Sequence, residues 1–308
     1  LEDLEKEKGI KKEYVLESIE TALVLAYKRN FDSAENVKVV VDGLEWIRKG
    51  AWRDADDNAV VYSSDALQYA LDANMNVILG CDIAGNVVAT QKADVKIVIN
   101  GNGKNYNGMI TVDGKSATYT TAGLTVKNLT FNATTISGDA CIRLGDGTDA
   151  TRYTSNVTVQ DCIFDVPGAV GVKSYTGGDK NLTISGCTAT ADAHSLLQAK
   201  GIDGILVKKC TINSKNGLNF NNSTNVLVEE CNADVRGYAA RFGEGSKANG
   251  AAETYEVKNS TLKSACEDGD AVIVLRGTAD ESTLTLTNTT LEGTTEITNN
   301  AVNAKVIK

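Results

Sequence analysis

The sequence predicts an all-β solenoid of stacked parallel strands, preceded by a short helical segment. A six-residue phrase recurs at intervals of 21 to 33 residues, and short strands with such a period are typical of solenoids. The 308 residues include 28 Gly and one Pro, which suits stacked strands because Gly turns corners and Pro removes a ladder donor. The seven copies are LTVKNL (124–129), VTVQDC (157–162), LTISGC (182–187), ILVKKC (205–210), VLVEEC (226–231), YEVKNS (255–260) and LTLTNT (284–289).

Each copy of the phrase is expected to form one strand that ends at a corner. In LTISGC, Leu182 and Ile184 alternate with Thr183 and Ser185, which is the period of two of a strand, and Gly186 follows at the turn. A second apolar stretch begins at a fixed offset, 7 residues after four of the phrases and 11 after two others. Each coil therefore has two constant strands and a variable loop after the second, with about six to nine coils in all. The second strands are ACIRL (140–144), AVGVK (169–173), HSLLQ (194–198), GLNFN (217–221), YAARF (238–242) and AVIVL (271–275).

The cysteines follow the repeat. Four of the seven occupy the sixth position of the phrase, which predicts a stack of thiols inside the coil. No C-x-x-C pair occurs and His194 is the only His, so we expect no zinc site. Stacked positions approach the Cα separation of a disulfide, which leaves bridges open, but the odd count favours reduced thiols that act as small hydrophobes.

Residues 1–42 differ from the rest of the chain: they are charge-rich, lack the phrase and carry helical spacing over 12–29, followed by an expected strand at Val37–Val41. Residues 43–60 are predicted to be a linker or a cap, and residues 61–308 the solenoid. At its start, Ser64 is the expected N-cap of a helix that ends near Ala73 and plugs the first coil.

The first 42 residues, with an EKGI turn, a helix ending in AYKRNF and an N-V-x-V-x-V-D strand, closely resemble the start of the N-terminal domain of the NusA transcription factors. In that family the domain binds RNA polymerase, and S1 and KH domains for RNA follow. Neither follows here, and no KH-type GxxG loop appears in a helical setting. The resemblance covers 42 of 308 residues and indicates a chimera with a join near residue 43. We expect this piece to be a fused leader or tag, and a contact with RNA polymerase is the alternative.

The span 60–308 resembles the right-handed parallel β-helix proteins of the pectate-lyase-like superfamily, as found in gut bacteria and phages. The predicted fold is thus a right-handed parallel β-helix with a short α-helical N-terminal segment. Relatives of this fold include lyases and hydrolases with recognisable catalytic sets, but the chain has no G-H-G, no R-I-K and no D-D pair within the repeats. The acidic segment 267–270 is expected to be a solvated corner, and His194 a structural residue.

The outward side chains of the second strands form the candidate ligand-binding face. If Ile142 and Leu144 point inward, Arg143 points outward, and Arg241 holds the same place in its own strand. Planar donors beside aromatic rings suit sugars or acidic glycans, and an ordinary solvated sheet face is the alternative. The candidate ligand-binding residues are Arg143, Lys173, Gln198, Asn219, Arg241, Arg276 and Tyr175, flanked by Tyr153 and Tyr238.

These features rank three functional hypotheses. The leading one is a non-enzymatic module that binds a surface or virion glycan; the others are a polysaccharide lyase or glycoside hydrolase, and a transcription-factor fragment that contacts RNA polymerase. A net charge of −9 gives nucleic-acid binding no electrostatic support. No membrane-length apolar run or signal peptide is visible, and no cofactor or metal is expected. We expect the β-helix part to be extracellular, on a cell surface or on a virion, and the NusA-like segment to be cytoplasmic.

Overall fold

The structure is a computed structural model that describes residues 18–22, 53–114, 121–133, 136, 139–145, 153–175, 177–243, 253–277, 281–301 and 304–308. The chain divides into two compact units, Leu1–Trp52 and Arg53–Lys308. In the first unit, residues 18–22 are helical, within the helix predicted over 12–29. The strand expected at Val37–Val41 lies outside the described residues. No helix in the described part of the chain has the length and apolarity needed to cross a membrane.

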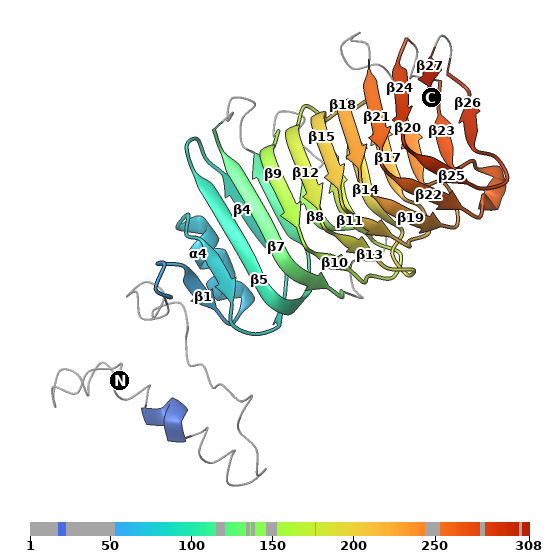
Figure 1. Cartoon of the computed structure of the whole chain (residues 1–308). Coiled ribbons are helices and arrows are strands. Elements are labelled where there is room, and N and C mark those ends of the chain that lie inside the picture. The colour runs from blue at the N-terminus through green and yellow to red at the C-terminus, as the bar shows by residue number, and fades with distance from the viewer. Residues whose placement is uncertain are drawn as a thin grey trace, which may run out of the picture. The chain divides into compact units, whose positions relative to one another are not determined.

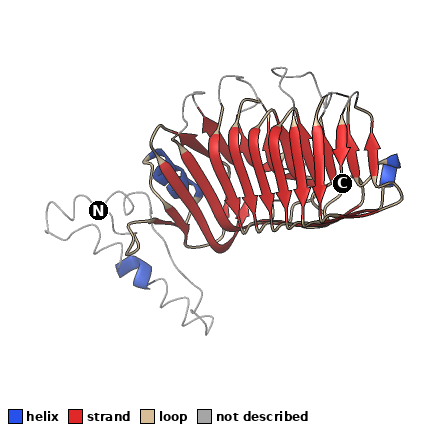
Figure 2. Ribbon diagram, turned by 45° about the horizontal axis from the view of Figure 1, so that its top comes forward, coloured by secondary structure: helices blue, strands red, loops and turns tan. Residues whose placement is uncertain are grey.

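The second unit is a parallel β-solenoid of about 8 turns, within the predicted range (Figure 1). Each turn presents up to three strands, which we number by face in chain order. Face 1 holds the strands of the repeated phrase, face 2 holds short strands after the corner, and face 3 holds the second strands of the prediction. Figure 2 shows the strands of successive turns side by side along the solenoid.

The N-terminal end begins with β1 (Ala59–Val61), α4 (Ser64–Asp72) and β2 (Val77–Leu79). Helix α4 packs against β1, β2 and β4 and buries Leu67, Ala70 and Leu71. The predicted N-cap was wrong by one residue: the Ser63 hydroxyl, not that of Ser64, accepts a hydrogen bond from the Ala66 N–H at 3.1 Å. Ser63 has the extended backbone of an N-cap, whereas Ser64 is already the first helical residue.

Face 1 consists of parallel strands whose register follows the phrase. Leu182 pairs with Val157 on one side and Ile205 on the other, and all three are buried, as the alternation predicts. The outward residue that follows each of them is Thr158, Thr183 or Leu206, and these three are also paired in register. The strands are β5 (Lys96–Asn107), β7 (Gly123–Phe131), β9 (Ser155–Gln160), β12 (Lys180–Ser185), β15 (Asp203–Lys208), β18 (Thr224–Glu229), β21 (Thr254–Lys258), β24 (Thr283–Thr287) and β27 (Lys305–Ile307).

The corner after face 1 is set by one backbone conformation. The fifth residue of every phrase is left-handed, with φ between 47° and 65°, although only one of the seven is Gly. At the five corners from Asp161 to Asn259, the N–H of this residue donates to a carbonyl of the next coil, as in Gly186 to Lys208 at 3.0 Å and Lys209 to Glu229 at 3.1 Å. The corner therefore bends the chain without interrupting the stacking. The residues at this position are Asn128, Asp161, Gly186, Lys209, Glu230, Asn259 and Asn288.

Face 2 was not predicted. Its strands are two to four residues long, so that they contain too few positions to show a period of two. Most begin two residues after the corner and continue the pairing of face 1 around the bend. They are β3 (Ile83–Ala84), β10 (Ile163–Phe164), β13 (Thr188–Ala189), β16 (Thr211–Ile212), β19 (Asn232–Val235), β22 (Thr261–Ser264) and β25 (Thr290–Glu292).

Face 3 is a sheet of nine parallel strands in the described part of the chain. It confirms the predicted second strands to within two residues at most ends. The strands are β4 (Val87–Gln91), β6 (Ile110–Gly114), β8 (Ala140–Leu144), β11 (Val170–Ser174), β14 (Ser195–Lys200), β17 (Leu218–Asn221), β20 (Ala240–Phe242), β23 (Ile273–Leu275) and β26 (Ile297–Asn299).

The core contains stacked side chains from successive turns. Phe131 stacks on Phe164 with ring centroids 5.3 Å apart, and Phe220 stacks on Phe242 at 5.2 Å. The four Cys of the sixth phrase position are buried, as predicted. Each thiol lies near carbonyl oxygens of its own coil and of the preceding one; the Cys187 Sγ, for example, lies 3.5 Å from the Ser185 oxygen and 3.6 Å from the Val159 oxygen.

Candidate functional site

The predicted outward residues of face 3 lie in one register row. Arg143 pairs with Lys173, Lys173 with Gln198, Gln198 with Asn219, and Asn219 with Arg241. Ile142 and Leu144 are buried on either side of Arg143, which confirms the direction in which its side chain points. Neighbouring strands are about 4.8 Å apart, so these five side chains span about 19 Å along the solenoid. We call them the polar row.

A buried strip borders the polar row on one side. The residues two positions before the row are buried, although the alternation of the strands directs them outward. Two of the six are Gly, at places where the backbones approach closely: a Cβ on Gly217 would lie 2.0 Å from the Ala239 oxygen, and one on Gly171 would lie 2.7 Å from the Leu196 oxygen. The strip consists of Cys141, Gly171, Leu196, Gly217, Ala239 and Val272.

At one end of the polar row, four side chains form a charged cluster. The Arg143 guanidinium lies 4.5 Å above the Tyr175 ring, and the Lys173 ammonium is also 4.5 Å from that ring. Asp139 forms an ion pair with Arg143 at 4.0 Å and accepts a hydrogen bond from the Tyr175 hydroxyl. Burial, together with this bond to Asp139, raises the pKa of Tyr175, so the phenol keeps its proton at neutral pH.

At the other end, Arg241 lies in a similar cluster. Its guanidinium carbon is 3.7 Å from the centre of the Tyr238 ring, and its Nη2 is 3.7 Å from the Asp270 carboxylate. The Arg241 side chain is 15% exposed and that of Asp270 is 23% exposed. Both arginines of the row are thus held between an aromatic ring and a carboxylate, in an arrangement that fixes their planes.

The middle of the row carries two amides beside the single histidine. The Gln198 Nε2 lies 3.2 Å from the His194 Nδ1, which is also 3.3 Å from the Ser195 hydroxyl. Burial, and then the positive charges of Lys215, Lys173 and Arg241, lower the pKa of His194. The imidazole is therefore neutral at pH 7. The Asn219 Oδ1 is buried and has no hydrogen-bond partner among the described residues.

Arg276 lies outside the row. Val274 pairs with Arg241, and Thr298 pairs with Val274, so these two residues continue the row where Arg276 was expected to contribute. Strand β23 ends at Leu275, and Arg276 follows it. It lines a hollow of about 370 Å³ at this end of the row, together with Val274, Thr298 and Asp270. Because Val274 and Thr298 also line this hollow, Arg276 belongs to the same surface as the polar row.

The flanking tyrosines do not offer the stacking surfaces that the sequence suggested. Tyr238 is 3% exposed and lies beneath Arg241. The Tyr175 ring is in contact with Arg143 and Lys173, and Tyr153 lies before β9, next to Gly178. The rings of Tyr175 and Tyr238 contact cations instead, and the polar row presents guanidinium, ammonium and amide groups to a ligand.

Sequence reasoning missed the two carboxylates of the face. Asp139 precedes Arg143 by four residues, Asp270 precedes Val274 by four, and His194 precedes Gln198 by four. This common offset was the available signal. It was obscured because the segment before face 3 varies in length, and the acidic run at 267–270 was assigned to a solvated corner. The structure places η1 (Glu267–Gly269) in that run and Asp270 in contact with Arg241.

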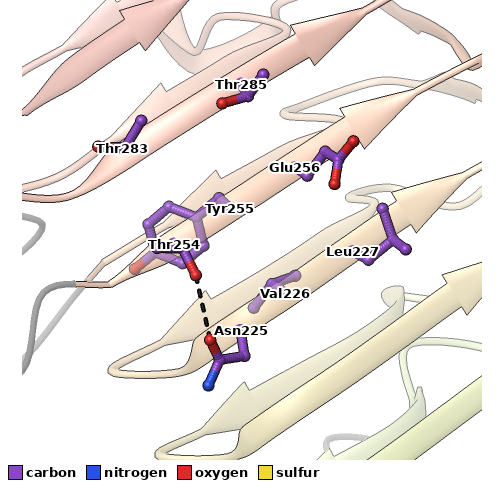
Figure 3. A pocket seen from close by; sticks show the side chains of 8 residues that line it. All are labelled: Asn225, Val226, Leu227, Thr254, Tyr255, Glu256, Thr283 and Thr285. Carbon is purple, nitrogen blue, oxygen red and sulfur yellow. Dashed lines mark hydrogen bonds between the residues drawn. The ribbon is translucent and has the colours of Figure 1, made fainter.

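A second hollow, of about 470 Å³, lies over face 1 (Figure 3). Glu256 is the one charged residue in its lining, and Val226 and Tyr255 belong to the buried core. The Thr254 hydroxyl and the Asn225 Oδ1, 3.3 Å apart, bind each other. This surface presents few free donors, so the polar row is the stronger candidate. Within the described residues, no group of three or more His, Cys, Asp or Glu is placed to hold a metal ion.

Comparison with known proteins agrees with the geometry of the solenoid. The family model described as the right-handed beta helix region matches residues 117–304, more than half of the chain. The chain belongs to the right-handed β-helix family. This confirms the predicted fold class, and the polar row lies inside the matched span. No solved structure matched the chain.

The start of this β-helix protein matches a different family. The model of the NusA N-terminal domain covers residues 1–69, past the expected join at residue 43 and into α4. The transcription termination/antitermination protein NusA of Bacillus subtilis (strain 168) is 67% identical over 36 residues, 12% of this chain and 10% of that protein. That of Halalkalibacterium halodurans is 60% identical over 42 residues, 14% and 11% of the two chains. The chain spans about a tenth of the length of these relatives, and the predicted resemblance is confirmed.

Proposed function

We propose that the protein is a non-enzymatic β-helix module that binds a glycan along the polar row, as an adhesin or a virion appendage does. The observation that carries the proposal is the register row itself. Five consecutive turns each present a side chain with hydrogen-bond donors, and the row runs from Arg143 to Arg241. A polymer of sugars offers hydroxyl groups along a line, and a row of fixed donors is complementary to it.

The local geometry supports this proposal. The two arginines are held in place by a ring and a carboxylate each, so less conformational entropy is lost when they bind a ligand. The hollow beside Val274, Thr298 and Arg276 gives the surface a recess at one end.

A glycan array probed with the whole chain tests the proposal. We expect binding to be lost in Arg143→Ala, Arg241→Ala and Gln198→Ala, and retained in Gln160→Ala, which removes an exposed glutamine from face 1. Unchanged binding in the three row variants means that the row is only a solvated face, and absence of binding to every glycan on the array contradicts the proposal as a whole.

A polysaccharide lyase or hydrolase is the second candidate, and His194 is the observation that favours it. Its imidazole lies beside the row, where the positive charges of Lys173 and Arg241 help to lower its pKa. A neutral imidazole can act as a general base. Incubation with polygalacturonate and other uronic polymers, with and without Ca²⁺, separates the two candidates. Turnover, measured by the absorbance of unsaturated products or by reducing ends and lost in His194→Gln, establishes the enzyme and rules out the binding module.

The match at the N-terminus favours a third candidate, a contact with RNA polymerase through residues 1–42. The matched relatives are named as transcription termination/antitermination proteins, and the chain shares about a tenth of their length. A pull-down with the full chain, compared with a chain that lacks residues 1–42, tests it. Equal retention of RNA polymerase by the two chains ends this candidate.

A further inference from the structure

We infer that the polar row takes an uncharged polysaccharide, and that Asp139 and Asp270 are specificity determinants that exclude acidic polymers. The inference rests on the proposed glycan binding and deepens it by naming the charge of the ligand. Arginine and lysine side chains suggest an acidic ligand at first sight. The contacts of those side chains point the other way.

Each arginine of the row already has a carboxylate from its own chain. Arg143 is paired with Asp139 at 4.0 Å, and Arg241 is paired with Asp270 at 3.7 Å. A ligand carboxylate that approaches either guanidinium comes close to an aspartate, and like charges brought together at an interface oppose binding. A sugar hydroxyl carries no charge and accepts the same N–H groups without this repulsion.

The aspartates are built into the fold. The Asp139 Oδ1 accepts the Ala140 N–H at 3.0 Å and also the Tyr175 hydroxyl, and its side chain is 37% exposed. The backbone N–H of Asp270 donates to the Glu267 oxygen at 3.3 Å, at the end of η1. A ligand therefore meets both carboxylates in place. The amides of Gln198 and Asn219, in the middle of the row, are uncharged, which suits a neutral chain between the two ends.

Lys173 is the third cation of the polar row. Lys215 lies near His194 beside the row, and Arg276 shares the hollow at its end with Asp270. Lys173 lies 4.5 Å from the centre of the Tyr175 ring, whose hydroxyl is bonded to Asp139. Its ammonium therefore lies against the ring that binds the carboxylate paired with Arg143. The His194 imidazole adds no positive charge at pH 7, because its pKa is lowered by burial and by the surrounding cations.

The test is a change of charge without a change of shape. The double variant Asp139→Asn/Asp270→Asn keeps an acceptor oxygen at each position and removes both negative charges. Its affinity for polygalacturonate, measured by calorimetry at low ionic strength, is compared with that of the unmodified chain. The control is Asp165→Asn/Asp234→Asn, which removes two exposed carboxylates from the side of face 2.

We expect the row variant to bind polygalacturonate at least about tenfold more tightly than the unmodified chain, with the gain lost at high salt, and the control to show no gain. Unmodified protein should also prefer methyl-esterified polygalacturonate to the free acid. No gain in the row variant, an equal gain in the control, or equal binding of acid and ester by the unmodified chain overturns the inference. If the unmodified chain binds no neutral glycan, the proposed function is contradicted. The gain in affinity of the row variant for polygalacturonate still decides, separately, whether the aspartates exclude acidic polymers.

Discussion

The Arg241 guanidinium carbon lies 3.7 Å from the centre of the Tyr238 ring, which is 3% exposed. Tyr238 belongs to a small buried cluster with Ala271 and Val274, on the outer side of face 3. Arg241 therefore covers an apolar cluster as well as forming an ion pair with Asp270. A residue of the polar row is in this way part of the packing that holds the row in place.

Replacement of Arg241 should lower stability as well as binding. Arg241→Ala uncovers Tyr238 and leaves Asp270 without this cation, and we expect the free energy of unfolding to fall by about 1–2 kcal/mol. Arg241→Lys keeps the charge but loses the planar contact, so its loss should be smaller. Urea unfolding measures both. Arg236→Ala, an exposed arginine five residues earlier, is the control and should change stability by less than about 0.5 kcal/mol. Equal losses in Arg241→Ala and Arg236→Ala contradict the packing role.

Asp179 should give the protein a recognisable pH dependence. Its side chain is 1% exposed, and its Oδ1 accepts the Thr154 N–H at 2.7 Å and the Thr154 hydroxyl at 2.9 Å. Burial raises the pKa of Asp179 above 3.8, and the hydrogen bonds oppose the shift. Between pH 3.8 and the raised value, the folded chain keeps a proton that the unfolded chain releases. The contribution of this group to stability is therefore present below pH 3.8 and is lost as the pH rises through the folded pKa.

Asp179→Asn removes this titration and keeps an acceptor for Thr154. The free energy of unfolding of the variant minus that of the unmodified chain should rise with pH across the same window and stay constant above it. Urea unfolding of both chains from about pH 3.5 to 8 gives this difference, in which the other carboxylates cancel. A difference that does not change with pH shows that the Asp179 pKa is the same in the folded and unfolded chains.

The left-handed corner predicts a stabilising substitution. Lys209 has φ of 54°, and Gly186 occupies the same position of the preceding coil with φ of 65°. A left-handed conformation costs roughly 1–2 kcal/mol for a residue with a side chain, and the extra freedom of Gly in the unfolded chain offsets part of that. We expect Lys209→Gly to be more stable than Lys209→Ala by about 0.5–1 kcal/mol in urea unfolding. Both variants lose the exposed ion pair with Glu230, so the alanine variant is the matched control. An alanine variant as stable as the glycine variant contradicts strain at this corner.

The thiols should separate into two classes. Cys81 and Cys266 are half-buried, and the other five are buried. A hydrogen bond with Cys162 and burial raise the pKa of Cys187 to about 12, and a hydrogen bond with Cys187 and burial raise that of Cys210 to about 12. Since the thiolate is the reactive form, we expect five thiols to resist dithiobis-nitrobenzoate at pH 8 until the chain is unfolded. In Cys81→Ala/Cys266→Ala the folded protein should not react; rapid reaction there shows that the stack is open to solvent.

The helix at the N-terminal end offers a test of its cap. Ser63→Ala removes the acceptor of the Ala66 N–H, and we expect it to destabilise the protein by about 1 kcal/mol. Ser64→Ala changes the first helical residue and should have a smaller effect in thermal unfolding. A larger loss in Ser64→Ala than in Ser63→Ala contradicts the cap that the structure shows.

The solenoid was predictable from the sequence because its signals are local and repeated. Leu182 and Ile184 alternate with polar residues, and the same alternation stacks in the next coil, so both the direction of the side chains and the register could be inferred. The polar row followed from the same argument, since Arg143 lies between two buried residues. The end of β23 at Leu275 agrees with the predicted strand at 271–275, so Arg276 lies just beyond the strand and Val274 holds the row position.

The contacts of the row could not be predicted in the same way. Whether a tyrosine offers a ring to a ligand depends on what lies above it, and the sequence does not show that Arg241 covers Tyr238. Asp139 and Asp270 share an offset of four residues before the row position, but they lie in connections whose lengths differ between coils, so their distance from the repeated phrase is not constant. The short strands of face 2 were missed because two residues, as in Thr188–Ala189, carry no alternation.

The polar row draws one side chain from each turn, and this separates the chemistry of the surface from the stability of the scaffold. Removal of one whole turn, such as residues 188–210, would join Cys187 to Thr211, which stacks on Thr188. Such a deletion would take Gln198 out of the row and bring Lys173 beside Asn219, with the core positions still matched. The set of donors along the surface can thus be changed by deleting or exchanging single turns, while the fold stays the same.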